Sequence, residues 1–254
     1  MAETLELAFR ALGRAAALGR FGAFALGLFG AACGEPTGLA RAATTESGAA
    51  LHWNERQIVL QLSPERPGAP LEPGVREALE RAAGTWNSAL AGCAAPRFAL
   101  GAKPLASPGI REDLANEVLF HRRTWSSPSS PDPDDGYDST RHALTRVRPH
   151  REPGNEGEIR DADIEVNGVG FEWSARGERA GTLSLEAMFV HELGHALGLD
   201  HPCLDAANAS VRCDDPRVQG AVMQPNAAEL FAGKSPGPLE AEIDTVCRSH
   251  AARR

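Results

Sequence analysis

The sequence predicts an α+β fold, in which helices and strands occur in separate runs along the chain. Residues 73–90 carry apolar side chains at the three- and four-residue spacing of a helix, whereas short apolar runs bounded by Pro and Gly are typical of strands. A chain of 254 residues can form one substantial domain, or two small ones, with a sizeable core. We expect the order strand, helix, several strands, helix, turn and last helix.

Order is expected to begin near Leu51, because residues 34–50 are rich in Gly, Ala and Thr and are typical of a linker. Residues 58–62 predict a strand, and the Pro/Gly-rich residues 63–73 predict a turn. In the helix predicted over 73–90, the apolar face contains Val75, Leu79, Ala82, Ala83, Trp86 and Leu90. We expect Trp86 to anchor the core.

Further strands are predicted at residues 98–100, 117–120, 141–148 and 159–166, with a loop at 126–140. Alternation in the last strand places three carboxylates on one face, which we expect to be a solvated face or part of a cation site: Asp161, Asp163 and Glu165.

The second helix is predicted over 183–197, with Thr182 or Ser184 as its N-cap. A final helix is predicted over 239–248.

The net charge of −8 excludes a typical nucleic-acid-binding surface. After the first 35 residues, no apolar run has the length of a membrane span. Residues 1–33 combine three arginines, an apolar stretch over 21–32 and small residues before Cys33, which predicts an export signal. A short buried or interfacial helix is the alternative.

Cys33 resembles the lipidation site of bacterial lipoproteins, which would tether the protein to a membrane, although simple cleavage of the signal would also fit. An exported chain enters an oxidising compartment, so the other four cysteines are expected to pair. Three pairings are possible, and we favour Cys203–Cys213 with Cys93–Cys247. Four free buried thiols are the alternative.

Residues 191–201 read His-Glu-Leu-Gly-His-Ala-Leu-Gly-Leu-Asp-His. His191 and His195 are four residues apart, so on a helix they share one face and can bind one ion. Gly198 can adopt a positive φ, end the helix and let His201 return as a third ligand. Glu192 lies beside the first ligand, where it can reach a zinc-bound water. An open fourth position would make this a catalytic zinc site.

This motif resembles the long zinc signature of the metzincin metalloproteases, H-E-x-x-H-x-x-G-x-x-H. Met223, in the sequence Ala-Val-Met-Gln-Pro, lies where that family has its methionine turn, and we expect it to pack beneath the ligands. The order of elements over 51–250 resembles the matrixin branch. Pro202, where matrixins usually have Ser, and a longer loop before Met223 depart from it.

The resemblance implies a zincin-like fold: a twisted, mainly antiparallel five-stranded sheet with one parallel pair, three helices, and a zinc cleft above a small lower subdomain. Residues 51–254 would then form one catalytic domain. It also implies that Glu192 acts as the general base in peptide-bond hydrolysis by a zinc-activated water. No Tyr follows Met223, so three histidines and water are expected at the metal, with Asp200 holding a ligand or simply solvated.

Matrixins also carry structural zinc and calcium ions. Residues that could serve such sites are His142, His150, Asp134, Asp138, Asp161 and Asp163. In the matrix metalloproteases a propeptide cysteine blocks the metal, and the sequence Cys33-Gly34-Glu35-Pro36 resembles that switch without its flanking Arg and Asp.

The sequence therefore predicts a monomeric zinc endopeptidase that is secreted or held at the cell surface and acts on a protein or peptide substrate. An inactive zinc-binding surface module and a non-proteolytic zinc hydrolase are the alternatives. The intact Glu192 argues against the first, and a peptide-cleavage assay would separate the second.

Overall fold

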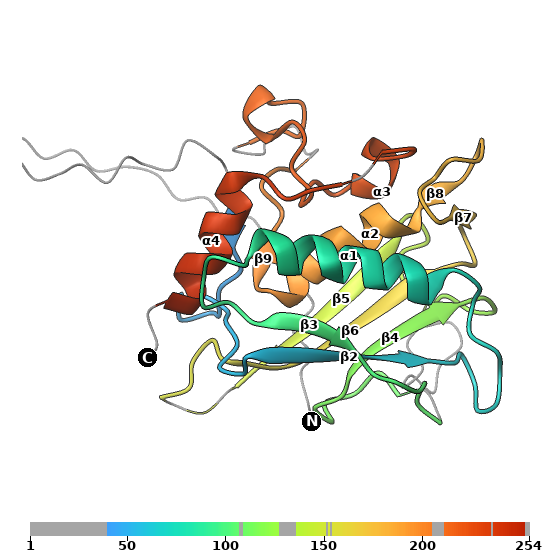
Figure 1. Cartoon of the computed structure of the whole chain (residues 1–254), viewed down its shortest axis with the longest axis horizontal. Coiled ribbons are helices and arrows are strands. Elements are labelled where there is room, and N and C mark those ends of the chain that lie inside the picture. Colours follow the sequence, from blue (N-terminus) through green and yellow to red (C-terminus); the bar gives the residue numbers. More distant parts are fainter. Residues whose placement is uncertain are drawn as a thin grey trace, which may run out of the picture. The chain divides into compact units, whose positions relative to one another are not determined.

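A computed structural model describes residues 40–106, 109–126, 136–150, 152, 154–204, 211–234 and 236–251 (Figure 1). The helices are α1 (Val75–Ala89), α2 (Leu185–Ala196), α3 (Ala227–Leu230) and α4 (Glu240–Ala251), with a short 3-10 helix at Pro216–Val218. The strands are β1 (Arg41–Ala42), β2 (Gln57–Ser63), β3 (Arg97–Leu100), β4 (Asn116–His121), β5 (Ala143–Pro149), β6 (Ile159–Asn167), β7 (Trp173–Ser174), β8 (Leu183–Ser184) and β9 (Leu199–Asp200). Among these elements, no helix combines the length and the apolar character that a membrane crossing requires.

Five strands form a mixed sheet in the order β3-β2-β4-β6-β5. The α+β class and the five strands are therefore confirmed, but the expected pairing is wrong. Three of the four strand pairs are parallel, and only β5 runs antiparallel, against β6. Helix α1 connects β2 to β3 and returns the chain to the same end of the sheet, which makes that pair parallel. The short connection after β5 instead reverses the chain.

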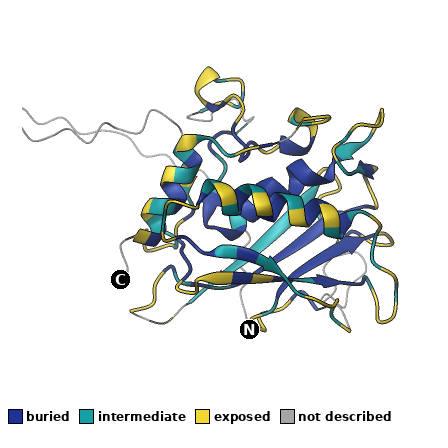
Figure 2. Cartoon of the chain, viewed as in Figure 1, coloured by how far each residue is buried: buried dark blue, intermediate teal, exposed yellow. Residues whose placement is uncertain are grey.

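Helices α1 and α2 pack over one face of the sheet (Figure 1). Trp86 of α1 has no exposed surface, and its Nε1 donates a hydrogen bond to the carbonyl of Val190 in α2, at 2.8 Å. The buried side of α1 faces the core while its outer side is exposed (Figure 2). The amphipathic spacing predicted for this helix and the core position of Trp86 are both confirmed.

On the other face of the sheet, the part formed by β6 is buried, contrary to the solvated face expected from the sequence. Asp161, Asp163 and Glu165 on β6 have no exposed surface. Arg148 of β5 lies 2.9 Å from Asp161 and 2.6 Å from Asp163, and Arg146 lies 3.0 Å from Glu165. Buried charges require such partners, so alternation in β5 supplies cations opposite the carboxylates of β6.

The ordered chain begins before Leu51. Arg41 and Ala42 form β1, which pairs antiparallel with β9, and the Arg41 guanidinium lies 3.7 Å from the Asp200 carboxylate. Ala43 is buried in the core. From residue 40 on, the segment expected to be a linker is therefore part of the fold. Residues 1–39, which include the expected export signal and Cys33, lie outside the described residues.

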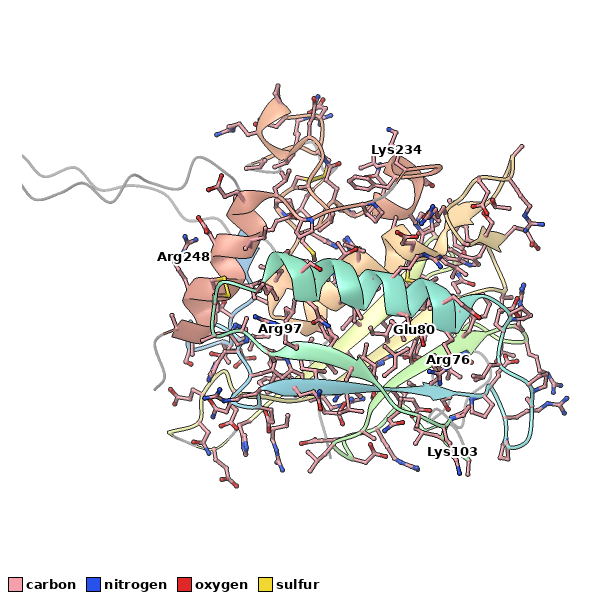
Figure 3. All side chains as sticks on the ribbon, viewed as in Figure 1. Arg76, Glu80, Arg97, Lys103, Lys234 and Arg248 are labelled. Carbon is pink, nitrogen blue, oxygen red and sulfur yellow. A yellow bond between two sulfur atoms is a disulfide. The ribbon has the colours of Figure 1, made fainter. Side chains whose placement is uncertain are left out.

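A disulfide joins Cys93, just after α1, to Cys247 on α4, as the favoured pairing predicted. Arg97, the first residue of β3, lies beside this bridge, with its Nη2 3.4 Å from the Cys93 carbonyl (Figure 3). Its guanidinium donates to the carbonyls of Leu90, at 2.5 Å, and Ala95, at 2.6 Å. The cation thus holds the turn between α1 and β3 through hydrogen bonds to its main-chain carbonyls.

The buried carboxylates should make stability depend on pH. Burial and the neighbouring Asp161 raise the pKa of Asp163 to about 8. The folded protein then holds a proton that the unfolded chain has released, so the stability that Asp163 contributes should fall as pH rises from about 4 to about 8. Asp163→Asn removes this contribution, so the stability of the variant relative to the wild type should rise across that window, measured as the difference between their guanidinium unfolding midpoints.

The control is Asp244→Asn, which changes an exposed carboxylate on α4 and should keep the wild-type slope. Equal slopes for wild type and Asp163→Asn would contradict the assignment.

Candidate metal centre

Helix α2 carries two of the three candidate ligands. Ser184 is its N-cap, and its hydroxyl accepts a hydrogen bond from the Ala187 N–H, at 3.1 Å. Eleven of the twelve helix residues are buried, so α2 is enclosed on nearly all sides. The prediction that Ser184 could cap the helix is confirmed, whereas Leu183 and Ser184 themselves form β8. A helix held in this way keeps its side chains in fixed positions.

The three histidines of the motif converge. His191 and His195 lie one turn apart on α2, and their Nε2 atoms are 3.1 Å from each other. Beyond the helix, Gly198 adopts φ +88°, a conformation that glycine tolerates best, and the chain turns back. His201 follows β9, and its Nε2 lies 3.1 Å from both other Nε2 atoms.

The hydrogen bonds made by the Nδ1 atoms determine which nitrogen of the His191 and His195 rings carries the proton. The Nδ1 atoms of His191 and His195 lie 2.8 Å from the Val222 carbonyl and 2.9 Å from the Leu199 carbonyl. A carbonyl only accepts, so each Nδ1 carries the proton and each Nε2 presents a lone pair in the neutral ring. Burial lowers the pKa of His191 well below its usual value and that of His201 to about 3.

Two neutral Nε2 atoms 3.1 Å apart have no proton to share, because both rings already donate through Nδ1. A cation would satisfy these two lone pairs together with the Nε2 of His201, which faces both. The three residues form the one group of metal-type ligands, within the described part of the chain, whose ligand atoms all lie within 4.8 Å of one another. The donor set therefore fits a metal ion.

Glu192 follows the first ligand and is buried, with 5% of its surface exposed. Burial raises the pKa of its carboxyl, while His195 and the Thr145 hydroxyl act in the opposite direction. The Thr145 Oγ1 donates to Glu192 Oε2 at 2.5 Å. Sequence reasoning missed Thr145, although alternation along β5 placed a polar residue on the side facing the core.

Met223 packs against Gly194 of α2 and is 1% exposed. A Cβ on Gly194 would lie 2.2 Å from the Met223 sulfur, so a larger residue at position 194 would push the Met223 side chain aside. This contact is with the helix that carries His191 and His195, and the position of Met223 below the ligands stays a prediction. Because the carbonyl of the preceding Val222 orients His191, the turn also sets the direction of a ligand ring.

Glu242 of α4 holds this turn in place and was missed in the sequence, where it resembles an ordinary acidic residue of a first helical turn. Its carboxylate accepts hydrogen bonds from the N–H groups of Met223, at 2.9 Å, Leu239, at 2.7 Å, and Val222, at 3.3 Å. It is 1% exposed, and burial raises its pKa.

A second disulfide, Cys203–Cys213, closes the loop immediately after His201, as favoured from the sequence. Asp200 orients the backbone of this ligand, because its Oδ1 accepts the His201 N–H at 2.7 Å. Tyr137 lies elsewhere, with its hydroxyl 3.0 Å from Glu165. Asp200 is thus a positioning group for the main chain of a ligand.

The residues considered for structural ions are not gathered into a second cluster among the described residues. His142 packs against Phe171, with ring centroids 4.5 Å apart, and its Nε2 lies 3.5 Å from Glu229. Asp138 accepts hydrogen bonds from Thr140. Asp161 and Asp163 are occupied by Arg148, and Asp134 lies outside the described residues.

Comparison with known proteins adds no assignment: no family model matches the sequence, and no curated protein is significantly similar to it.

The folded protein should bind a divalent ion at the three histidines more tightly than the unfolded chain does, so binding should stabilise the fold. We expect added zinc to raise the unfolding temperature. At a free zinc concentration one hundred times Kd, the free energy of unfolding should increase by roughly 3 kcal/mol. Differential scanning calorimetry would measure it. His195→Ala should abolish the increase, and His142→Ala should retain it; an unchanged increase in His195→Ala would refute the site.

Glu242→Ala should leave buried N–H groups of the methionine turn without an acceptor. We expect a loss of about 2–3 kcal/mol in the free energy of unfolding, measured by guanidinium titration. Glu242→Gln keeps one acceptor and should lose less. If both variants were as stable as the wild type, the turn would not depend on this carboxylate.

Proposed function

We propose that this protein is a zinc-dependent endopeptidase. The observation that supports it most is the convergence of three histidine Nε2 atoms next to a buried glutamate. Such a group offers three ligands and an acid–base residue, and three protein ligands leave a coordination position open, as in catalytic zinc sites.

Zinc suits this donor set. Tetrahedral zinc with Zn–N distances of about 2.0–2.1 Å separates its nitrogen ligands by about 3.3–3.4 Å. The Nε2 atoms are 3.1 Å apart, close to that spacing before any ion is added. Backbone carbonyls orient two of the rings, an arrangement that is common among metal-binding histidines.

When bound, zinc supplies a Lewis acid that activates water and polarises a carbonyl group. His191, His195 and His201 hold the ion through neutral rings. Glu192 takes a proton from the attacking water and delivers it to the leaving amine. Burial raises the pKa of this carboxyl, which brings the base closer to the pH at which proton transfer works well.

The open edge of the sheet at β5 is a second observation in favour of a peptide substrate. Among the described strands β5 pairs with β6 alone, and the His142 carbonyl accepts the Asn167 N–H. By alternation, Ala143, Thr145 and Val147 direct their N–H and C=O groups away from β6. An extended peptide can pair with such an edge, which binds main chain irrespective of side chain.

Two features support assignment to the metzincins, with the matrixins as the nearest branch. They are the histidine motif and the contact of the Met223 sulfur with α2. The expected cleft above the metal is part of this proposal. Two disulfides favour an oxidising compartment and hence an exported protein. Cleavage or lipidation at Cys33 would then decide between secretion and a membrane tether.

The full chain, oxidised and zinc-loaded, should cleave a mixture of unfolded protein substrates such as casein and gelatin. Mass spectrometry of the products would give the sites. Glu192→Ala should reduce the rate by at least about 100-fold while keeping one zinc per chain, because Glu192 is a base and not a ligand. Glu77→Ala, which removes an exposed carboxylate from α1, is the matched control and should retain full activity.

A chelator should abolish cleavage and added zinc should restore it. If the zinc-loaded wild type leaves every peptide intact but hydrolyses simple esters, the protein is a non-proteolytic hydrolase. If it does neither, the site is a binding module and the proposal is wrong.

A further inference from the structure

We propose that Thr145 is a positioning residue that holds Glu192 in the orientation required for proton transfer, and that it links this base to the strand that binds substrate. The inference rests on the proposed peptidase function. It concerns a residue that neither binds the metal nor belongs to the histidine motif.

The geometry starts from the alternation of β5. Arg146 and Arg148 point toward the carboxylates of β6, so Thr145 points to the opposite face, where α2 packs. There its Oγ1 lies 2.5 Å from Glu192 Oε2 and 3.3 Å from the main-chain carbonyl of the same residue. A hydroxyl has one proton, and the shorter contact, to the carboxylate, is the one that receives it.

This contact distinguishes the two carboxylate oxygens. Oε2 accepts the Thr145 hydroxyl, whereas Oε1 makes no hydrogen bond to any described residue. The free oxygen is the one that can take up a proton. A glutamate has several rotatable bonds, and the anchored Oε2 removes most of that freedom before substrate arrives.

Thr145 has a second role through its main chain. Its N–H and C=O face the open edge of β5, where a substrate strand would pair. One residue would therefore bind the peptide through its backbone and the base through its side chain. The distance between the bound peptide and Glu192 is then set within a single residue, and a shift of the strand would move both together.

The test compares Thr145→Val with Thr145→Ser in the full chain, oxidised and zinc-loaded, on a peptide that the wild type cleaves. Valine keeps the shape and the backbone but removes the donor, so kcat should fall about 10- to 100-fold while KM stays within about twofold. Serine keeps the donor and should recover most of kcat. Thr85→Val is the matched control, because Thr85 donates to the Arg81 carbonyl on α1 and should leave both constants unchanged.

Thermal unfolding gives a readout independent of turnover. Thr145→Val should lower the unfolding temperature of the zinc-loaded chain, because a buried carboxylate loses its donor. In a Glu192→Ala background the same substitution should have little effect, since the acceptor is gone. This double-mutant cycle measures the contact itself.

The outcomes separate the two proposals. If the wild type cleaves no peptide, the proposed peptidase function is wrong, and the proposed role of Thr145 is wrong with it. A wild type that cleaves, with Thr145→Val equal to it in kcat, overturns only the positioning role. A rise in KM at constant kcat, or a serine variant as slow as valine, would also overturn it. Should valine prevent folding, Thr145→Ala and the serine variant carry the same comparison.

Discussion

The enclosure of α2 is the constraint on which the candidate metal centre depends. Its buried residues contact α1, the sheet and the segments beyond the helix, so it cannot rotate without disturbing all of them. Trp86 and Trp53 each donate an indole hydrogen bond to a carbonyl of this helix, at 2.8 and 2.7 Å. Because two ligands and the candidate base lie on α2, its rigidity becomes the rigidity of the site.

The two faces of the sheet differ in the side chains that they bury. The face under the helices is apolar, with Ala162, Ile164 and Val166 buried among other core residues. The opposite face buries carboxylates with arginines, an arrangement that adds little net stability but fixes which strands can be neighbours. β5 takes part in both, since its arginines hold β6 while Thr145 reaches α2. The edge strand is thereby fixed relative to the metal centre.

The sequence was most informative where function restricts residue type most strongly. The spacing of His191, His195 and His201 and the pairing of the cysteines were predictable, since each depends on a local pattern or a small number of combinations. Strand direction was not predictable from segment patterns, because a strand has the same alternation whichever way it runs. Thr145 and Glu242 were missed because their roles come from contacts across the fold: 47 residues separate Thr145 from Glu192, and 19 separate Glu242 from Met223.

The segments that complete the metal centre come from the two ends of the described chain. β1 pairs with β9 just before His201, and the Trp53 N–H donates to His250, 197 residues away. Cys93 and Cys247 are joined across 154 residues. Contacts this distant in sequence form late, after most of the chain is available. A chain still attached to the ribosome would therefore lack the contacts that hold β1, β9 and α4 around the three histidines until residues 240–251 have emerged.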